Sequence, residues 1–167
     1  MKILDRIKGQ AWCFGDNLNT DVIHSPRFFS LDPEVIKKGL FHGLDPNIQA
    51  NIQPMDVIVG GINFGCGSSR ETSVRSLCLN KVGAIIAVDF ARIFFRNCTN
   101  MGLPCLMFKN PNDFSRINTG MTLQVDALAG RILLPDRTEI QCKPVNDFIR
   151  NIWVKGGLLA TLPQSNK

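Results

Sequence analysis

A serine pair followed by an arginine, Ser68-Ser69-Arg70, stands directly behind a glycine-rich segment at 60–67. Glycines let the backbone approach a ligand closely, and the planar guanidinium of an arginine matches a carboxylate. Ser68 and Glu71 fit the S-x-x-E capping box, which predicts a helix that begins near Ser68. The N-terminus of a helix carries unpaired N–H groups and a partial positive charge. The segment therefore predicts an anion-binding site with hydroxyl groups beside it.

Other readings of this segment are weaker. No lysine follows the glycines at the spacing of a P-loop, and the order G-x-G-S-S differs from the G-x-S-x-G of a hydrolase elbow. The chain has only two histidines, His24 and His42, which argues against a Ser–His–acid triad. Cys66 precedes the predicted helix, but the sequence shows no base beside it. The plainest alternative is that Ser68 only caps a helix and Arg70 is solvated; the glycines favour a ligand site, because a cap requires none of them.

The hydrophobic pattern around the motif predicts an α/β fold. Apolar runs at 57–59, 82–88 and 105–108 predict buried parallel strands, with a helix from Ser68 and another over 90–100 between them. The other expected elements are a strand at 8–14, a loop of about twenty residues after it, a short helix from Asp32-Pro33, a connection at 47–55, an antiparallel meander at 121–126, 131–135 and 138–142, a helix at 146–155 and a frayed tail at 158–167. The prediction is one domain over 1–167, with its core at about 8–155: a parallel α/β core with appended antiparallel strands.

The bulk composition predicts a cytoplasmic protein. The chain is 44% hydrophobic and 20% charged, without a run of 18 apolar residues or a signal-peptide pattern, so no membrane association is expected. Its six cysteines show no C-x-x-C spacing, which favours buried thiols over disulfides and predicts no metal site on this chain. The net charge is +5 without a run of basic residues, which favours an acidic small substrate or an acidic partner over nucleic acid.

Three motifs in this order, GDNLNTDVI at 15–23, FGCGSSRE at 64–71 and DFARIFFRNCTNMGLP at 89–104, resemble the swivel domain of the aconitase superfamily. Because this domain makes up the whole chain, the sequence most resembles the small subunits of 3-isopropylmalate dehydratase. The resemblance implies an aconitase-type swivelling β/β/α domain. It also implies a hydro-lyase that isomerises 2-isopropylmalate and 3-isopropylmalate by dehydration and rehydration, a step of leucine biosynthesis.

The resemblance also implies roles for individual residues. Ser68 corresponds to the family's catalytic base, Ser69 and Arg70 to residues that bind a substrate carboxylate, and Asp21 to a member of the active-site network. Without the resemblance, the composition of Asn19-Thr20-Asp21 is typical of a turn. In this family the [4Fe-4S] cluster and its cysteine ligands belong to a large subunit, which implies a heterodimer or heterotetramer. One iron of that cluster acts as a Lewis acid on the departing hydroxyl.

The loop Arg27-Phe28-Phe29-Ser30-Leu31 occupies the place that sets substrate choice in this family. Homoaconitase-like members carry an arginine there to hold a distal carboxylate, whereas this chain has Ser30. An apolar pocket suits an isopropyl branch better than a carboxylate, which is costly to bury unpaired. Thr72 replaces a histidine found in many members. Other 2-hydroxyacids (2,3-dimethylmalate, citramalate, homoaconitate) stay open as substrates, as does a non-catalytic anion-binding or RNA-binding module. The sequence leaves two roles open for Arg92: packing within its helix, or facing the site or the partner.

Overall fold

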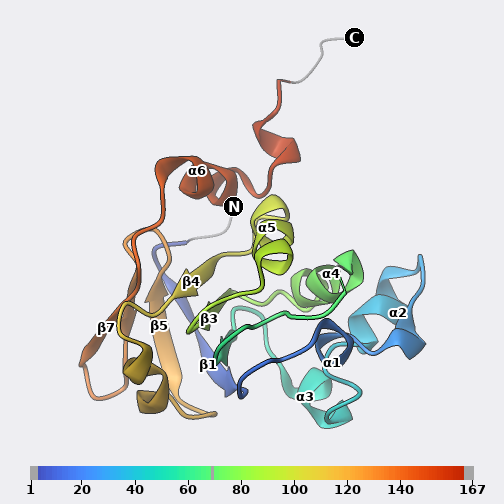
Figure 1. The fold of residues 1–167 in the computed structure, drawn as a ribbon, viewed down its shortest axis with the longest axis horizontal. Helices are drawn as coiled ribbons and strands as arrows, with labels where there is room; N and C mark the ends of the chain where they lie inside the picture. Colours follow the sequence, from blue (N-terminus) through green and yellow to red (C-terminus); the bar gives the residue numbers. More distant parts are fainter. Residues whose placement is uncertain (1–3, 69, 164–167) are drawn as a thin grey trace.

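The computed structural model describes residues 4–68 and 70–163, whose strands form a seven-stranded sheet in the order β4-β3-β2-β1-β5-β6-β7 (Figure 1). The parallel half contains β1 (Ile7–Cys13), β2 (Val57–Gly60), β3 (Ala84–Ala87) and β4 (Cys105–Met107). The antiparallel half contains β5 (Thr122–Asp126), β6 (Arg131–Leu133) and β7 (Glu139–Gln141). β1 joins the two halves, because it runs parallel to β2 and antiparallel to β5.

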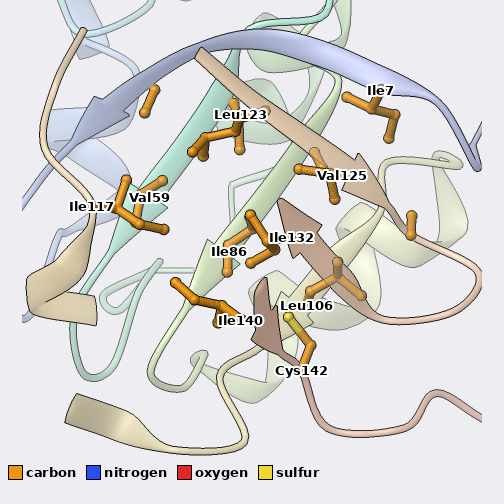
Figure 2. Packing of buried hydrophobic residues seen from close by; sticks show 14 of the residues in the cluster. Ile7, Val59, Ile86, Leu106, Ile117, Leu123, Val125, Ile132, Ile140 and Cys142 are labelled. Carbon is orange, nitrogen blue, oxygen red and sulfur yellow. The ribbon is translucent and has the colours of Figure 1, made fainter. Parts of the chain in front are cut away.

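The sheet curves until its two outer strands meet. The backbone N–H of Lys143 donates to the carbonyl of Met107 (2.7 Å), and the N–H of Lys109 donates to the carbonyl of Gln141 (3.0 Å). The antiparallel strands therefore lie across one face of the parallel strands. Figure 2 shows the apolar side chains packed between them, with Val59, Ile86 and Leu106 from the parallel half and Leu123, Val125, Ile132 and Ile140 from the antiparallel half.

Helices cover the opposite face of the parallel strands. Val57 and Val59 point into the space between the two halves of the sheet, whereas Ile58 between them packs on the helical side. There it belongs to one buried cluster with Val74 of α4 (Glu71–Leu79) and Phe94 of α5 (Arg92–Asn100). Figure 1 shows the antiparallel strands on the left, the parallel strands in the middle, and α4 and α5 to their right. This arrangement confirms the predicted β/β/α fold class.

Three predictions about local structure are wrong. The region expected to be a plain loop after β1 contains α1 (Thr20–Ile23) and the 3-10 turn η1 (Pro26–Phe28). The expected connection at 47–55 contains α3 (Pro46–Asn51), whose N-cap Asp45 accepts a hydrogen bond from the N–H of Asn47 (2.9 Å). The tail expected to fray contains the 3-10 turn η3 (Leu159–Thr161), because the N–H of Leu158 donates to the carbonyl of Asn100 (2.8 Å). Residues 164–167 lie outside the described residues.

Two further helices agree with the sequence, whereas a 3-10 turn before the antiparallel strands is not among the predicted elements. In α2 (Pro33–Lys38), Asp32 is the N-cap and accepts a hydrogen bond from the N–H of Glu34 (2.9 Å), as its Asp-Pro start predicts. α6 (Asp147–Lys155) ends at Gly156, and η2 (Pro111–Arg116) precedes the antiparallel strands. In the described part of the chain, no helix is long and apolar enough to cross a membrane.

Candidate functional site

The candidate site lies where the loops after β2 and β3 meet, at the carboxyl ends of the parallel strands. The N–H of Phe64 donates to the carbonyl of Asp89 (3.1 Å), and the N–H of Ala91 donates to the carbonyl of Phe64 (2.9 Å). These bonds fix the glycine-rich loop to the segment that leads into α5. Carboxyl ends of parallel strands are the usual ligand-binding edge of such sheets.

The same loop is also bound to the segment that leads into α1. The N–H of Gly65 donates to the carbonyl of Leu18 (2.8 Å), and the N–H of Thr20 donates to the carbonyl of Cys66 (2.9 Å). The Thr20 hydroxyl donates to the backbone carbonyl of Ser68 (2.9 Å). The three sequence motifs, which are far apart along the chain, therefore meet around one loop.

Two glycines make this meeting possible. Gly65 has φ +80°, and a Cβ there would lie 2.2 Å from the ring of Phe94. Gly67 has φ +98°, and a Cβ there would lie 2.7 Å from the side-chain amide of Asn19. L-residues rarely adopt such a backbone conformation, and the clashes would separate the motifs. Glycine at these two positions therefore allows the loop to bend and to pack closely against Phe94 of α5 and Asn19, the N-cap of α1.

Ser68, Arg70 and Asp21 form one polar cluster at the tip of this loop. The Nε of Arg70 donates a hydrogen bond to the Ser68 hydroxyl (2.9 Å) and lies 3.3 Å from a carboxylate oxygen of Asp21. Ser68 is exposed, and the side chains of Arg70 and Asp21 retain 34% and 46% of their surface. The cluster therefore presents a hydroxyl, oriented by a guanidinium, to the outside of this chain.

The predicted capping box is absent. α4 begins at Glu71, and its N-cap is Arg70, whose side chain makes no capping hydrogen bond. Ser68 lies before the cap position, and its hydroxyl accepts from Arg70 instead of from an amide in the first turn. The prediction that the helix starts at Ser68 is wrong because the bend through Gly67 holds Ser68 outside the helix. Ser69, predicted to bind a carboxylate, lies outside the described residues.

Phe29 connects the predicted specificity loop to this cluster. The guanidinium carbon of Arg70 lies 4.7 Å from the centroid of the Phe29 ring, within the range of a cation–π contact. Phe29 also stacks on His24, with ring centroids 5.7 Å apart. The other loop residues lie further round the chain surface: Phe28 packs on His42, the Ser30 hydroxyl accepts from the N–H of Asp32 (3.0 Å), and Arg27 and Leu31 are exposed.

His24 supports Phe29 as a neutral ring. It is buried, its Nε2 lies 3.1 Å from the carbonyl of Ile36, and its Nδ1 has no hydrogen-bond partner in the described part of the chain. A second proton, on Nδ1, would be buried without an acceptor. Burial accordingly lowers the pKa of His24 below its ordinary value, although the Ile36 carbonyl partly opposes this.

This lowered pKa predicts a pH-dependent stability. Below the ordinary histidine pKa of about 6.5, His24 is protonated in the unfolded chain but stays neutral in the folded chain. The free energy of unfolding therefore falls as pH decreases. We expect a slope of at most about 1.4 kcal/mol per pH unit below pH 6.5 in urea titrations. His24→Gln should flatten that slope, whereas the control His42→Gln should keep it; an unchanged slope in His24→Gln would assign the effect to other groups.

A cavity of about 200 Å³ opens beside the cluster. Ser68, Arg70 and residues from the first turn of α5 all contribute to its lining. The remaining lining residues are Thr20, Gly65, Gly67, Ala91, Arg92, Ile93, Phe94 and Asn97. Arg92, which the sequence left open between packing and the site, therefore shares a cavity with the predicted base. The cavity is smaller than the roughly 300–1,000 Å³ of typical ligand sites.

None of the six cysteines, all of which the structure describes, forms a disulfide. Cys98, Cys105 and Cys142 are buried, and burial raises the pKa of Cys142 to about 12. Cys66 in the site loop is partly buried. Across residues 4–68 and 70–163, no group of three His, Cys, Asp or Glu side chains could hold a metal ion. The donor set of these residues therefore does not fit an iron–sulfur cluster.

Known proteins match both the sequence and the fold. A model of the aconitase C-terminal domain matches residues 41–111. The 3-isopropylmalate dehydratase small subunit of Syntrophus aciditrophicus is 37% identical over 164 residues, which cover 97% of this chain and 99% of that protein. The methanogen homoaconitase small subunit of Methanothermobacter thermautotrophicus is 41% identical over 157 residues, which cover 92% of this chain and 88% of that protein. A crystal structure of the 3-isopropylmalate dehydratase LeuD from Methanocaldococcus jannaschii superposes with a TM-score of 0.85 at 34% identity, covering 93% of this chain and 92% of that one.

Proposed function

Because this chain belongs to the family of 3-isopropylmalate dehydratase small subunits, in the aconitase superfamily, we propose that it is the small subunit of a hydro-lyase acting in leucine biosynthesis. The reaction is the interconversion of 2-isopropylmalate and 3-isopropylmalate by dehydration and rehydration. The observation that carries the proposal for the site is the hydrogen bond from the Nε of Arg70 to the exposed hydroxyl of Ser68.

Ser68 is the proposed base. A serine hydroxyl is a poor base near neutral pH unless its anion is stabilised. The guanidinium of Arg70, with its N–H directed at the Ser68 oxygen, stabilises that alkoxide. The alkoxide takes the proton from the substrate carbon next to the carbon that loses its hydroxyl, and it returns the proton during rehydration. Asp21 holds Arg70 in place through the ion pair.

Ser69 and Arg70 are the proposed carboxylate ligands. Arg70 is suited to this role because a guanidinium can form two parallel hydrogen bonds to a carboxylate. Its Nε is engaged with Ser68 and Asp21, while the aromatic ring of Phe29 lies against its plane. The two terminal nitrogens of the Arg70 guanidinium remain to bind a carboxylate of the substrate.

The partner is a large subunit that carries a [4Fe-4S] cluster, in a heterodimer or heterotetramer. When bound, such a cluster supplies a Lewis acid for the departing hydroxyl. We place the cluster in the large subunit, as the family resemblance implies, because no group of three His, Cys, Asp or Glu side chains among the described residues could hold a metal ion. The exposed position of Ser68 suits a site that is closed by another chain. We propose that the assembly works in the cytoplasm, on a small 2-hydroxy acid and without a nucleic acid or a membrane as partner.

Reconstitution tests this function. The isolated chain should show no turnover, and mixing it with a cluster-loaded large subunit should produce hydro-lyase activity towards 2-isopropylmalate. A panel of branched and tricarboxylic 2-hydroxyacids then ranks the substrates by kcat/KM. Salt-sensitive RNA binding without turnover would instead favour the non-catalytic module.

Substrate choice is proposed to depend on the loop at 27–31. A homoaconitase small subunit matches this chain as well as the dehydratase subunits do, so overall identity does not separate the two substrates. Ser30→Arg should shift the ratio of kcat/KM values by about 10–100-fold towards substrates with a distal carboxylate, as expected for one charged hydrogen bond. Ser115→Arg, at an exposed serine of η2, is the matched control and should leave the ratio unchanged. Equal ratios in wild type and Ser30→Arg would remove the loop from substrate selection.

A further inference from the structure

Arg92 is an arginine whose charge is not paired within the described part of the chain. Its side chain is exposed, and it makes no hydrogen bond or ion pair with the residues that the structure describes. It nevertheless lines the same cavity as Ser68 and Arg70. A ligand seated in that cavity would therefore share it with two arginine side chains.

The position of Arg92 is electrostatically unfavourable for folding. It is the first residue of α5, where the positive end of the helix dipole repels a cation. It also stands four residues before Arg96 on the same helix, a spacing at which like charges repel. The N-cap Ala91 has no side chain that could satisfy the N–H groups of the first turn. An anion bound in the cavity would relieve all three features.

The two arginines of the cavity differ in what already pairs with them. Arg70 has the carboxylate of Asp21 at 3.3 Å, so one charge offsets the other before any ligand arrives. Arg92 has no such counter-charge among the described residues. Among the described residues that line the cavity, the positive charge without a counter-charge is therefore that of Arg92.

We propose that Arg92 binds a second carboxylate of the substrate, opposite the carboxylate held by Arg70. This inference rests on the proposed function, in which the substrate is a dicarboxylate. The first turn of α5 then forms the second wall of the substrate site, with Asn97 one turn further along the same cavity wall. Ser68 lines the same cavity as the two arginines, so a substrate held by both would have the carbon between its carboxylates close to the Ser68 oxygen.

The test compares Arg92→Gln with Arg96→Gln in the reconstituted enzyme. Arg96 is one turn along α5 and does not line this cavity, so it controls for the loss of one positive charge. Arg92→Gln should raise KM for 2-isopropylmalate about 10–100-fold and change kcat much less, whereas Arg96→Gln should leave both near wild type. Arg92→Lys should recover part of the loss.

Inhibitors separate substrate binding from subunit docking. Inhibition by the dicarboxylate maleate should weaken by at least about tenfold in Arg92→Gln, while inhibition by the monocarboxylate isovalerate stays unchanged. An unchanged KM together with weaker subunit association would overturn the proposal and make Arg92 a docking residue. If the wild-type assembly shows no turnover, the proposed function fails, but calorimetric titration with maleate still tests whether Arg92 binds a carboxylate. Equal maleate affinity in wild type and Arg92→Gln would overturn this role of Arg92. A weaker affinity in the variant would support it.

Discussion

Replacing Ser68 by alanine should lower kcat of the reconstituted enzyme by at least about 10³-fold, which is within the range attributed to a positioned base. The variant removes the oxygen that accepts the Arg70 hydrogen bond and that is proposed to take the proton. The loop itself should persist, because Thr20 is bound to the backbone carbonyl of Ser68 and not to its hydroxyl. The loss should therefore appear in turnover, with thermal unfolding and subunit association close to wild type.

The controls separate the base from a general effect on the surface. Ser115 is an exposed serine in η2 whose hydroxyl donates to the carbonyl of Asn112 (2.8 Å), and Ser115→Ala should leave kcat unchanged. Ser69→Ala should raise KM more than it lowers kcat, as expected for a carboxylate ligand. A kcat within a few-fold of wild type in Ser68→Ala would show that another group is the base.

The sheet was largely predictable because its parallel strands are buried on both faces. Runs such as Val57-Ile58-Val59 and Ala84-Ile85-Ile86 are apolar at every position, and the structure places them between two clusters of buried side chains. α3 was missed although Asp45-Pro46 repeats the Asp32-Pro33 signal that correctly predicted α2. The curvature that joins β4 to β7 was not predictable, because it depends on long-range backbone pairing between Met107 and Lys143.

The site was predictable only in part. The composition around Ser68 and Arg70 indicated an anion site, but it supported the wrong local structure, because the capping-box pattern takes no account of the positive φ at Gly67. Only the family resemblance indicated Asp21, since a turn-like tripeptide carries no sign of a distant arginine partner. The contacts of Phe29 and the position of Arg92 depend on segments that are far apart in the sequence and meet in the fold. No local sequence pattern predicts them.

Arg70→Lys should reduce kcat/KM by about 10²–10³-fold, or about 2.7–4 kcal/mol of transition-state stabilisation, although it keeps the positive charge. Lysine has no planar fork, so it cannot contact the Ser68 hydroxyl, the Asp21 carboxylate and a substrate carboxylate from fixed directions at once. Its ammonium also loses the flat contact with the ring of Phe29. We expect kcat to fall because the alkoxide is less stabilised, and KM to rise because the carboxylate is held less well. Arg75→Lys on α4 is the matched control and should behave as wild type.

A double-mutant cycle decides whether Arg70 acts through Ser68. If the guanidinium stabilises the Ser68 anion, its effect on kcat depends on the presence of that oxygen. The variant that combines Ser68→Ala with Arg70→Lys should then have nearly the same kcat as Ser68→Ala alone. Fully additive losses in kcat would mean that the 2.9 Å hydrogen bond between the two side chains has no part in catalysis, and that Arg70 serves the substrate carboxylate independently. The cycle thus tests the contact itself and not only the two residues that make it.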